Sequence, residues 1–70
     1  MYTTYRSFYK YGREGDEVEL TIKEFDTIEK AINYAHRYAK GIRFVNVQIE
    51  NEDGKVVYEI IADGGVFDYR

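Results

Sequence analysis

Hydrophobic and polar residues alternate strictly over residues 17–23, and a period of two is the pattern of a strand that is buried on one face. The apolar members of this run are Val18, Leu20 and Ile22. We expect these three side chains to face the core and the charged members to face solvent, as charged residues do on an edge strand.

Residues 2–11 form a second run that is rich in aromatic and β-branched side chains, which suit a pleated surface better than a helix. This run has apolar or aromatic groups on both faces, as a central strand does. Residues 12–16, Gly-Arg-Glu-Gly-Asp, supply turn chemistry between the two runs. Residues 2–11 and 17–23 therefore predict a hairpin.

The period changes to that of a helix after Asp26, where apolar residues recur every three or four positions. We expect Asp26 to cap the first backbone amides and Glu29 to reach back to the N–H of the capping residue. Gly41 is expected to end the helix in a left-handed conformation. The apolar stripe predicts packing on a sheet, and it consists of Ile28, Ala31, Ile32, Ala35 and Ala39.

Two further strands are predicted at residues 42–51 and 55–62, around a turn centred on Asp53 and Gly54. A shift of the pairing by one residue would bury the carboxylate of Glu59, which is costly. The pairs that the turn predicts are apolar throughout: Ile49 with Tyr58, Val47 with Ile60, and Val45 with Ala62.

The predicted element order is β-β-α-β-β, an α+β two-layer sandwich with one helix on one face of a four-stranded antiparallel sheet. We favour the spatial order 2-1-3-4, because the first strand has the character of a central strand and the second that of an edge strand. The order 1-2-4-3 is the alternative. Residues 63–70 begin with a flexible break, and we expect them either to fold back on the sheet or to form a flexible or docking tail.

Length and composition argue against several classes of protein. A chain of 70 residues is expected to form one domain over residues 1–70, and the absence of Cys excludes disulfide scaffolds and thiol nucleophiles. The net charge of −3 disfavours bulk attraction to nucleic acid or anionic lipid. No apolar run reaches the ~18 residues of a membrane helix, and residues 1–15 lack the apolar core of a secretory signal. We therefore expect a soluble, cytoplasmic protein.

The aromatic content is the first feature that points to a function, since Phe and Tyr make up 17% of the chain. One helix can bury only one face of the sheet, so the other face is expected to show an apolar patch to solvent. Monomers seldom expose such patches, and we therefore expect a partner protein or a homodimer to cover this one, with the C-terminal tail as the alternative cover. The predicted partner-binding residues are Tyr2, Phe8, Phe44, Val57 and Ile61.

The second feature is a basic end of the helix, formed by Arg37, Lys40 and Arg43 beside two tyrosines of the same helix. Basic and aromatic groups on one surface are typical of single-stranded nucleic-acid binding, so these three residues are the alternative, nucleic-acid or nucleotide-binding site. The pattern places the aromatic and basic groups on different layers, however. This reading makes nucleic acid the less favoured partner.

Candidate catalytic chemistry is sparse. His36 is the only histidine, it lies near cationic residues, and no Ser or Cys is expected beside it. A hydrolase or transferase built on His36 is the least favoured reading. We therefore expect no catalytic residues, no metal site and no cofactor.

The strand-helix-hairpin run from Phe25 to Glu59 looks like many short bacterial and phage domains. In size, acidity and lack of catalytic groups the chain is also similar to small phage-encoded inhibitors of host defence, such as anti-CRISPR proteins. This resemblance is one of type and implies no functional residues. The function expected from the sequence is a non-enzymatic protein-interaction module that uses the open face of the sheet.

Overall fold

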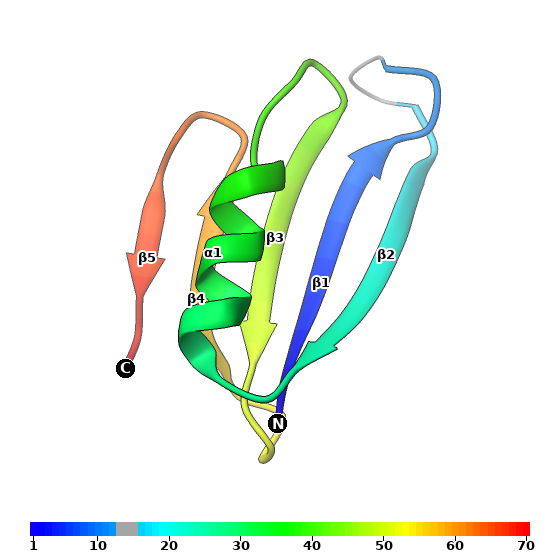
Figure 1. Cartoon of the computed structure of the whole chain (residues 1–70). Coiled ribbons are helices and arrows are strands. Elements are labelled where there is room, and N and C mark those ends of the chain that lie inside the picture. The colour runs from blue at the N-terminus through cyan, green and yellow to red at the C-terminus, as the bar shows by residue number, and fades with distance from the viewer. Residues whose placement is uncertain (13–15) are drawn as a thin grey trace.

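A computed structural model of the chain describes residues 1–12 and 16–70, so the turn predicted over residues 12–16 lies largely outside the described residues. The described part is an α+β fold with one helix and one antiparallel sheet, which confirms the predicted class (Figure 1). The elements are β1 (Tyr2–Tyr9), β2 (Val18–Phe25), α1 (Ile28–Tyr38), β3 (Phe44–Glu50), β4 (Val56–Ile61) and β5 (Val66–Asp68).

The sheet has five strands in the order β2-β1-β3-β4-β5, not the four that the sequence predicts. The predicted order 2-1-3-4 is present within it, and the alternative order 1-2-4-3 is wrong. The fifth strand arises because the tail folds back on β4, where the N–H of Ile61 donates to the carbonyl of Gly65 at 2.9 Å. Three residues are too short a run for a periodic pattern to reveal.

The helix begins one residue later than predicted. Its N-cap is Thr27, whose hydroxyl accepts a hydrogen bond from the N–H of Lys30 at 3.3 Å. Asp26 instead accepts from the side chain of Lys30, so the predicted Asp26–Glu29 capping box is wrong. The predicted apolar stripe is confirmed, since Ala31 and Ala35 are fully buried. Neither this helix nor any other described segment provides a helix long and apolar enough to span a bilayer.

The hairpin of β3 and β4 has the predicted pairing in its middle, with Ile49 opposite Tyr58 and Val47 opposite Ile60. Its turn differs, because Asn51 pairs with Lys55 and a bulge at Val56 and Val57 then restores the register. At the other end β4 stops at Ile61, and the predicted pair of Val45 with Ala62 is absent from the ladder.

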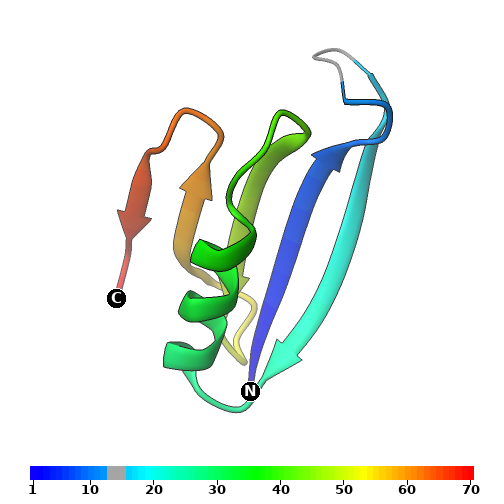
Figure 2. The ribbon, with the colours of Figure 1, turned by 45° about the horizontal axis from the view of Figure 1, so that its top comes forward.

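The core lies between α1 and one face of the sheet, which we call the helix-side face (Figure 2). Residues that pair directly across neighbouring strands share a face. Thr4, Ile49 and Tyr58 therefore form one buried row across β1, β3 and β4, with Val47 and Ile60 in the next row. We call the opposite side of the sheet the open face.

The orientation of β2 is opposite to the prediction. Pairing of Thr4 with Lys23 puts Lys23 on the helix-side face and leaves Val18, Leu20 and Ile22 on the open face. These three side chains are 54%, 53% and 58% exposed, so the expectation that they enter the core is wrong. The reason is the width of the sheet: α1 packs against β1, β3 and β4 and meets β2 at its Phe25 end, so the rest of β2 lies beyond the helix at the edge of the sheet (Figure 1).

Candidate functional site

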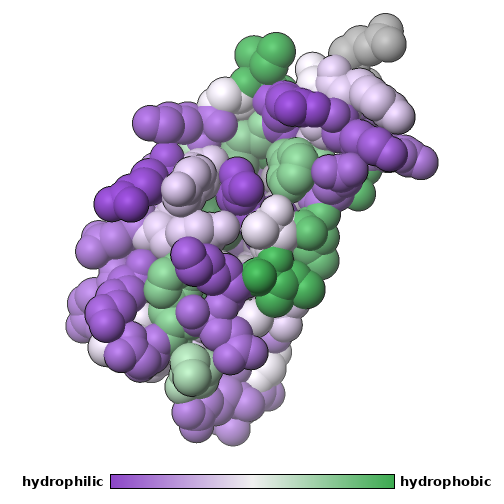
Figure 3. Space-filling view, turned by 45° about the vertical axis from the view of Figure 1, so that its right-hand side comes forward, coloured by the Kyte–Doolittle hydropathy of each residue, from purple (hydrophilic) through white to green (hydrophobic). Residues whose placement is uncertain are grey.

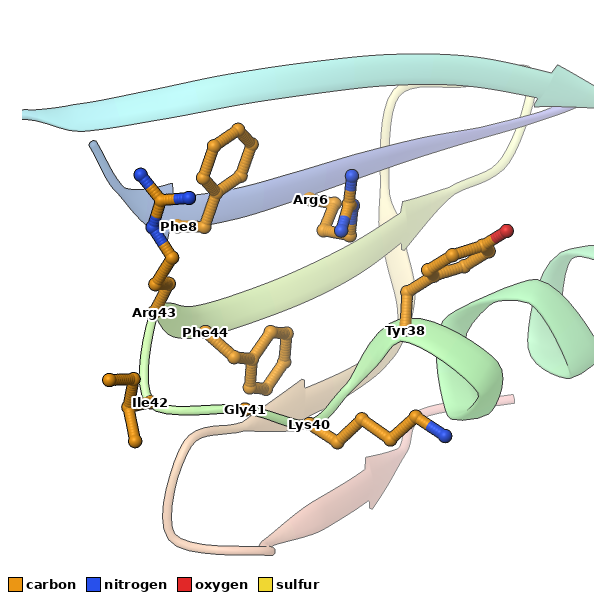
Figure 4. A pocket seen from close by; sticks show the side chains of 8 residues that line it. All are labelled: Arg6, Phe8, Tyr38, Lys40, Gly41, Ile42, Arg43 and Phe44. Carbon is orange, nitrogen blue, oxygen red and sulfur yellow. The ribbon is translucent and has the colours of Figure 1, made fainter. Parts of the chain in front are cut away.

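The helix-side face has a groove where α1 meets β1 and β2. It consists of two adjoining hollows of about 510 and 280 Å³ that share Tyr38 as a common wall. The larger hollow is closed at its other end by the loop between α1 and β3, as Figure 4 shows. We call the two hollows together the basic groove, because of the cations described below.

Arg6 lies at the centre of the larger hollow. Its guanidinium carbon is 5.2 Å from the ring centre of Phe8 and 5.1 Å from that of Tyr38, so the cation lies between two aromatic rings (Figure 4). Its Nε atom is buried without a hydrogen-bond partner, and no carboxylate among the described residues pairs with the guanidinium. Arg6 is therefore a cation held in place by packing, with hydrogen-bonding capacity left unused.

Arg43 forms the rim of the same hollow and is fixed by the backbone of β1. Its Nε donates to the carbonyl of Tyr9 at 3.2 Å, and its Nη2 donates to the carbonyl of Lys10. Gly12 allows this approach, because it has a φ of +80° and a Cβ there would lie 3.3 Å from Cγ of Arg43. The rim cation therefore keeps a fixed position without a carboxylate.

Three aromatic rings continue along the smaller hollow. Phe25 and Tyr34 have ring centres 5.1 Å apart, and Tyr34 and Tyr38 are 4.9 Å apart, each pair in a tilted arrangement. The ammonium group of Lys23 lies 5.5 Å from the ring centre of Phe25 and 5.4 Å from that of Tyr34. Aromatic faces and cations thus alternate along the whole groove.

Charge is strongly segregated in this acidic chain. Six of the ten Lys and Arg residues line the two hollows, and none of the described carboxylates does. Only one of the six has an ion pair among the described residues: Lys30 lies 3.0 Å from Asp26 and holds the pKa of that carboxyl below its ordinary value. Glu19 borders the groove, since it pairs with Phe8 on the helix-side face. The six cations are Arg6, Lys23, Lys30, Arg37, Lys40 and Arg43.

The open face is different in kind. Its middle is polar, because Asn46 and Gln48 on β3 both donate to the carboxylate of Glu59 on β4, at 3.1 and 3.2 Å. At the β2 edge of the open face, separated from this polar belt by β1, three apolar side chains are exposed. We call them the β2 stripe: Val18, Leu20 and Ile22. Figure 3 brings the β2 edge of the sheet forward and shows hydrophobic surface at that edge.

The structure does not bring the predicted partner-binding residues together on the open face. Phe44 is 7% exposed and belongs to the core, and Phe8 and Tyr2 lie with it on the helix-side face. Val57 is half-buried and packs against the core cluster, and Ile61 alone of the five remains half-buried toward the open face. The error has two causes: the alternation of β1 was assigned to the two faces the wrong way round, and a register shift between β1 and β3 places Phe44 opposite Phe8 on the helix-side face.

The structure does bring the predicted nucleic-acid-binding residues together. Lys40 and Arg43 line the larger hollow and Arg37 the smaller one, so all three belong to one groove. The expectation that the aromatic groups of the sheet and the basic groups of the helix end lie on different layers is wrong, because Phe8 and Phe25 of the sheet line the same groove. Sequence reasoning missed Arg6 and Lys23. Each is a cation at a helix-side position of its strand, and that position can be recognised only once the register of β1 and β2 is known.

His36 contacts a tyrosine. Its Nε2 lies 2.7 Å from the hydroxyl of Tyr58, and the two rings meet edge to face at 5.8 Å. Over residues 1–12 and 16–70, no three His, Cys, Asp or Glu side chains cluster as metal ligands would. Comparison of the chain with protein-family models, with curated proteins and with solved structures found no match.

Proposed function

We propose that the protein is a non-enzymatic protein-interaction module that acts by adding a strand to the outer edge of β2. The observation that supports this proposal best is the long apolar edge with no cover. β2 has eight residues, no proline and no bulge in its pairing with β1, and its outward stripe is more than half exposed. Edges of this type are templates for another strand, and natural proteins normally shorten or charge them.

The two edges of the sheet differ in this respect. β5 at the other edge has only three residues, and Arg70 beside it closes a pair with Asp68 at 2.7 Å. That pair holds the pKa of Asp68 at about 2, mainly through the side-chain hydrogen bond. A short, charged edge is protected against pairing with another strand. β2 is eight residues long, and its open-face positions 18, 20 and 22 carry no charge.

The direction of the backbone groups identifies which residues of β2 are open to a partner strand. Lys10 donates to the carbonyl of Glu17 at 2.8 Å, and hydrogen-bonded pairs alternate along an antiparallel ladder. The peptide groups of the odd residues of β2 therefore point toward β1. Those of the even residues point outward: Val18, Leu20, Ile22 and Glu24.

The partner best supported is a second copy of the chain, because β2 is self-complementary in an antiparallel register. A two-fold axis through Thr21 sets Leu20 opposite Ile22 of the second copy on the open face. It also sets Glu19 opposite Lys23 of the second copy on the other face, twice by symmetry. A register two residues away would oppose Asp16 and Glu24, which are both acidic. The favoured pairing extends the sheet across the dimer.

The proposal includes no catalysis. His36, the one histidine, contacts the hydroxyl of Tyr58, and no carboxylate among the described residues hydrogen-bonds to its ring. A general base is normally oriented by such a group. An inhibitor role of the kind that the likeness to phage-encoded proteins implies would use the same edge.

The test is the oligomeric state of charge variants by analytical ultracentrifugation. In the favoured register Glu19→Lys places two lysines opposite each other at both sites, and we expect dimer dissociation to increase about tenfold. The double variant Glu19→Lys with Lys23→Glu restores opposite charges and is expected to recover the dimer. The matched apolar pair is Ile22→Asp, which should abolish the dimer, and Val66→Asp on β5, which should not.

Amide hydrogen exchange separates strand addition from packing of two open faces. Strand addition protects the outward amides of Leu20 and Ile22 as the concentration is raised, whereas face-to-face packing leaves them unprotected. A protein that sediments as a monomer at its highest soluble concentration, or a dimer that Glu19→Lys leaves unchanged, would contradict the proposed pairing.

A further inference from the structure

We infer that the basic groove is a binding site for single-stranded nucleic acid. This inference goes beyond the proposed function and does not depend on it, because the groove lies on the helix-side face and is complete within one chain. A single strand presents a phosphate charge and a flat base at each nucleotide. Proteins that bind one without sequence preference combine a cationic groove with aromatic rings on which bases stack.

The aromatic part of the groove has exposed ring area for this purpose. Tyr38 is 42% exposed although its ring contacts both Tyr34 and the guanidinium of Arg6. It is the wall shared by the two hollows, so a base stacked on it would have cations on either side. A large ring held half-exposed by its neighbours needs little ordering when a ligand binds.

The cationic part has charges without carboxylate partners. Among the described residues, four groove cations make neither an ion pair nor a hydrogen bond to a backbone carbonyl: Arg6, Lys23, Arg37 and Lys40. Arg6 is distinctive because its buried Nε has no partner, and a buried unpaired donor normally costs stability. An incoming phosphate oxygen would supply an acceptor to its guanidinium.

The net charge of −3 does not oppose this assignment. The acidic residues are displaced from the groove to the open face, the turns and the outer side of the helix, such as Glu59 and Glu29. Two carboxylates border the groove without lining it: Asp26 pairs with Lys30 at 3.0 Å, and Glu19 lies opposite Phe8. Because exposed charges are screened over about 8–10 Å, a ligand in the groove experiences mainly the cations that line it.

A single strand fits this groove better than a duplex does. Stacking on Tyr34 and Tyr38 needs a base whose face is accessible, and the faces of duplex bases are covered by their neighbours. The two hollows lie end to end along the helix, and this gives room for consecutive nucleotides. A free phosphate shares only the charge contacts and would use no ring.

The probe is a fluorescently labelled oligothymidylate of about ten nucleotides, titrated with the full chain and followed by anisotropy. With four phosphate contacts, the logarithm of the association constant is expected to fall against the logarithm of salt with a slope of about −3. A duplex of the same length and inorganic phosphate as a competitor are the comparison arms. We expect both to bind more weakly than the single strand.

Two matched pairs of variants locate the site. Tyr38→Leu removes the central ring and should weaken oligothymidylate binding about tenfold, whereas Tyr69→Leu, an exposed tyrosine outside the groove, should not. Lys40→Gln should reduce the salt slope by about 0.7, whereas Lys55→Gln in the hairpin turn should leave it unchanged. Circular dichroism confirms that each variant is folded.

Chemical-shift perturbation of backbone amides gives an independent measurement on the wild-type chain. Shifts that gather on Arg6, Tyr38 and the loop at residues 40–43 support the inference. No anisotropy change at low salt would overturn it. Equal losses for Tyr38→Leu and Tyr69→Leu, or tighter binding of the duplex, would also overturn it, since each result shows binding by charge alone or at another place.

Discussion

The basic groove and the β2 stripe are the two sides of the same uncovered part of the sheet, and their chemistry is opposite. The groove has aromatic rings with cations and, among the described residues, no lining carboxylate. The stripe has aliphatic side chains on the open face, where β1 separates it from the polar belt of Asn, Gln and Glu on β3 and β4. Both lie toward the β2 edge of the sheet, beyond the part of β1, β3 and β4 against which α1 packs (Figure 2). The comparison shows that one incomplete layer can produce two surfaces for two kinds of partner.

The two surfaces are also built with different rigidity. Groove residues are fixed by packing between α1 and β1, as Arg6 is between Phe8 and Tyr38, whereas the stripe depends only on the pairing of β2 with β1. One contact links them. The hydroxyl of Thr4, which is fully buried, donates to the carbonyl of Lys23 on β2 at 2.9 Å. Variants can therefore affect both surfaces or only one.

The largest expected effect is the loss of both surfaces together. Ile49→Ala removes a fully buried side chain from the central row, and we expect the free energy of unfolding to fall by about 2–5 kcal/mol. This is a large part of the stability of a domain of this size. Urea denaturation followed by circular dichroism measures it. A loss below 1 kcal/mol, as is typical of surface sites, would contradict the assignment of the core.

Salt should separate the two surfaces. Raising the ionic strength from about 50 to 200 mM is expected to weaken oligothymidylate binding in the groove roughly fiftyfold, because phosphate contacts release counterions. Apolar strand addition at β2 should change little over the same range, since only its Glu19–Lys23 pairs are screened. Anisotropy and sedimentation measure the two responses. Parallel responses would show that one surface accounts for both interactions.

The link through Thr4 predicts a smaller effect that is directed to β2. Thr4→Val keeps the shape of the buried side chain and removes its hydrogen bond to Lys23, at an expected cost of about 1 kcal/mol. Hydrogen exchange should accelerate at the odd amides of β2 more than at those of β4. Uniform acceleration over the sheet would mean that the bond stabilises the whole fold rather than the outer strand.

The smallest effect is expected at the opposite edge, which serves as a control for both surfaces. Arg70 lowers the pKa of Asp68 to about 2, so this contact stabilises the fold above the ordinary pKa and is lost as the pH falls toward 2. Asp68→Asn should remove that part of the acid response and leave the dimer and oligothymidylate binding unchanged at neutral pH. A carboxyl titration by NMR checks the pKa, and a midpoint near 4 would contradict the pairing.

Local patterns predicted most of the elements because local physics determines them. The helical stripe around Ala31 and Ala35 was read correctly from its period, and the pairing of Ile49 with Tyr58 from the need for an apolar face. The N-cap was one residue out, because Asp26 and Thr27 are both good capping residues and only the geometry distinguishes them. The turn type was wrong because a bulge compensates for a longer loop.

The candidate site was predicted less well, because the strands were located correctly but their two faces were assigned to the wrong sides of the sheet. Alternation tells which side chains share a face, but it does not tell which face meets the helix. For β2 the apolar face was assigned to the core, and the structure exposes it. For β1 the same error moved Phe8 to the open face and hid the fact that Arg6 lies beside the tyrosines of the helix.

The sequence by itself determined the class of the fold and the positions of the long elements, because hydrophobic period and turn residues act over a few residues. It favoured the observed order of the first four strands but left a second order open. Tertiary structure alone decided where the helix lies on the sheet, and therefore which faces of β1 and β2 stay uncovered. That decision depends on the summed packing of residues far apart in the chain, such as Ala35, Phe44 and Ile60. It separated the cations from the carboxylates and gave the protein its two surfaces.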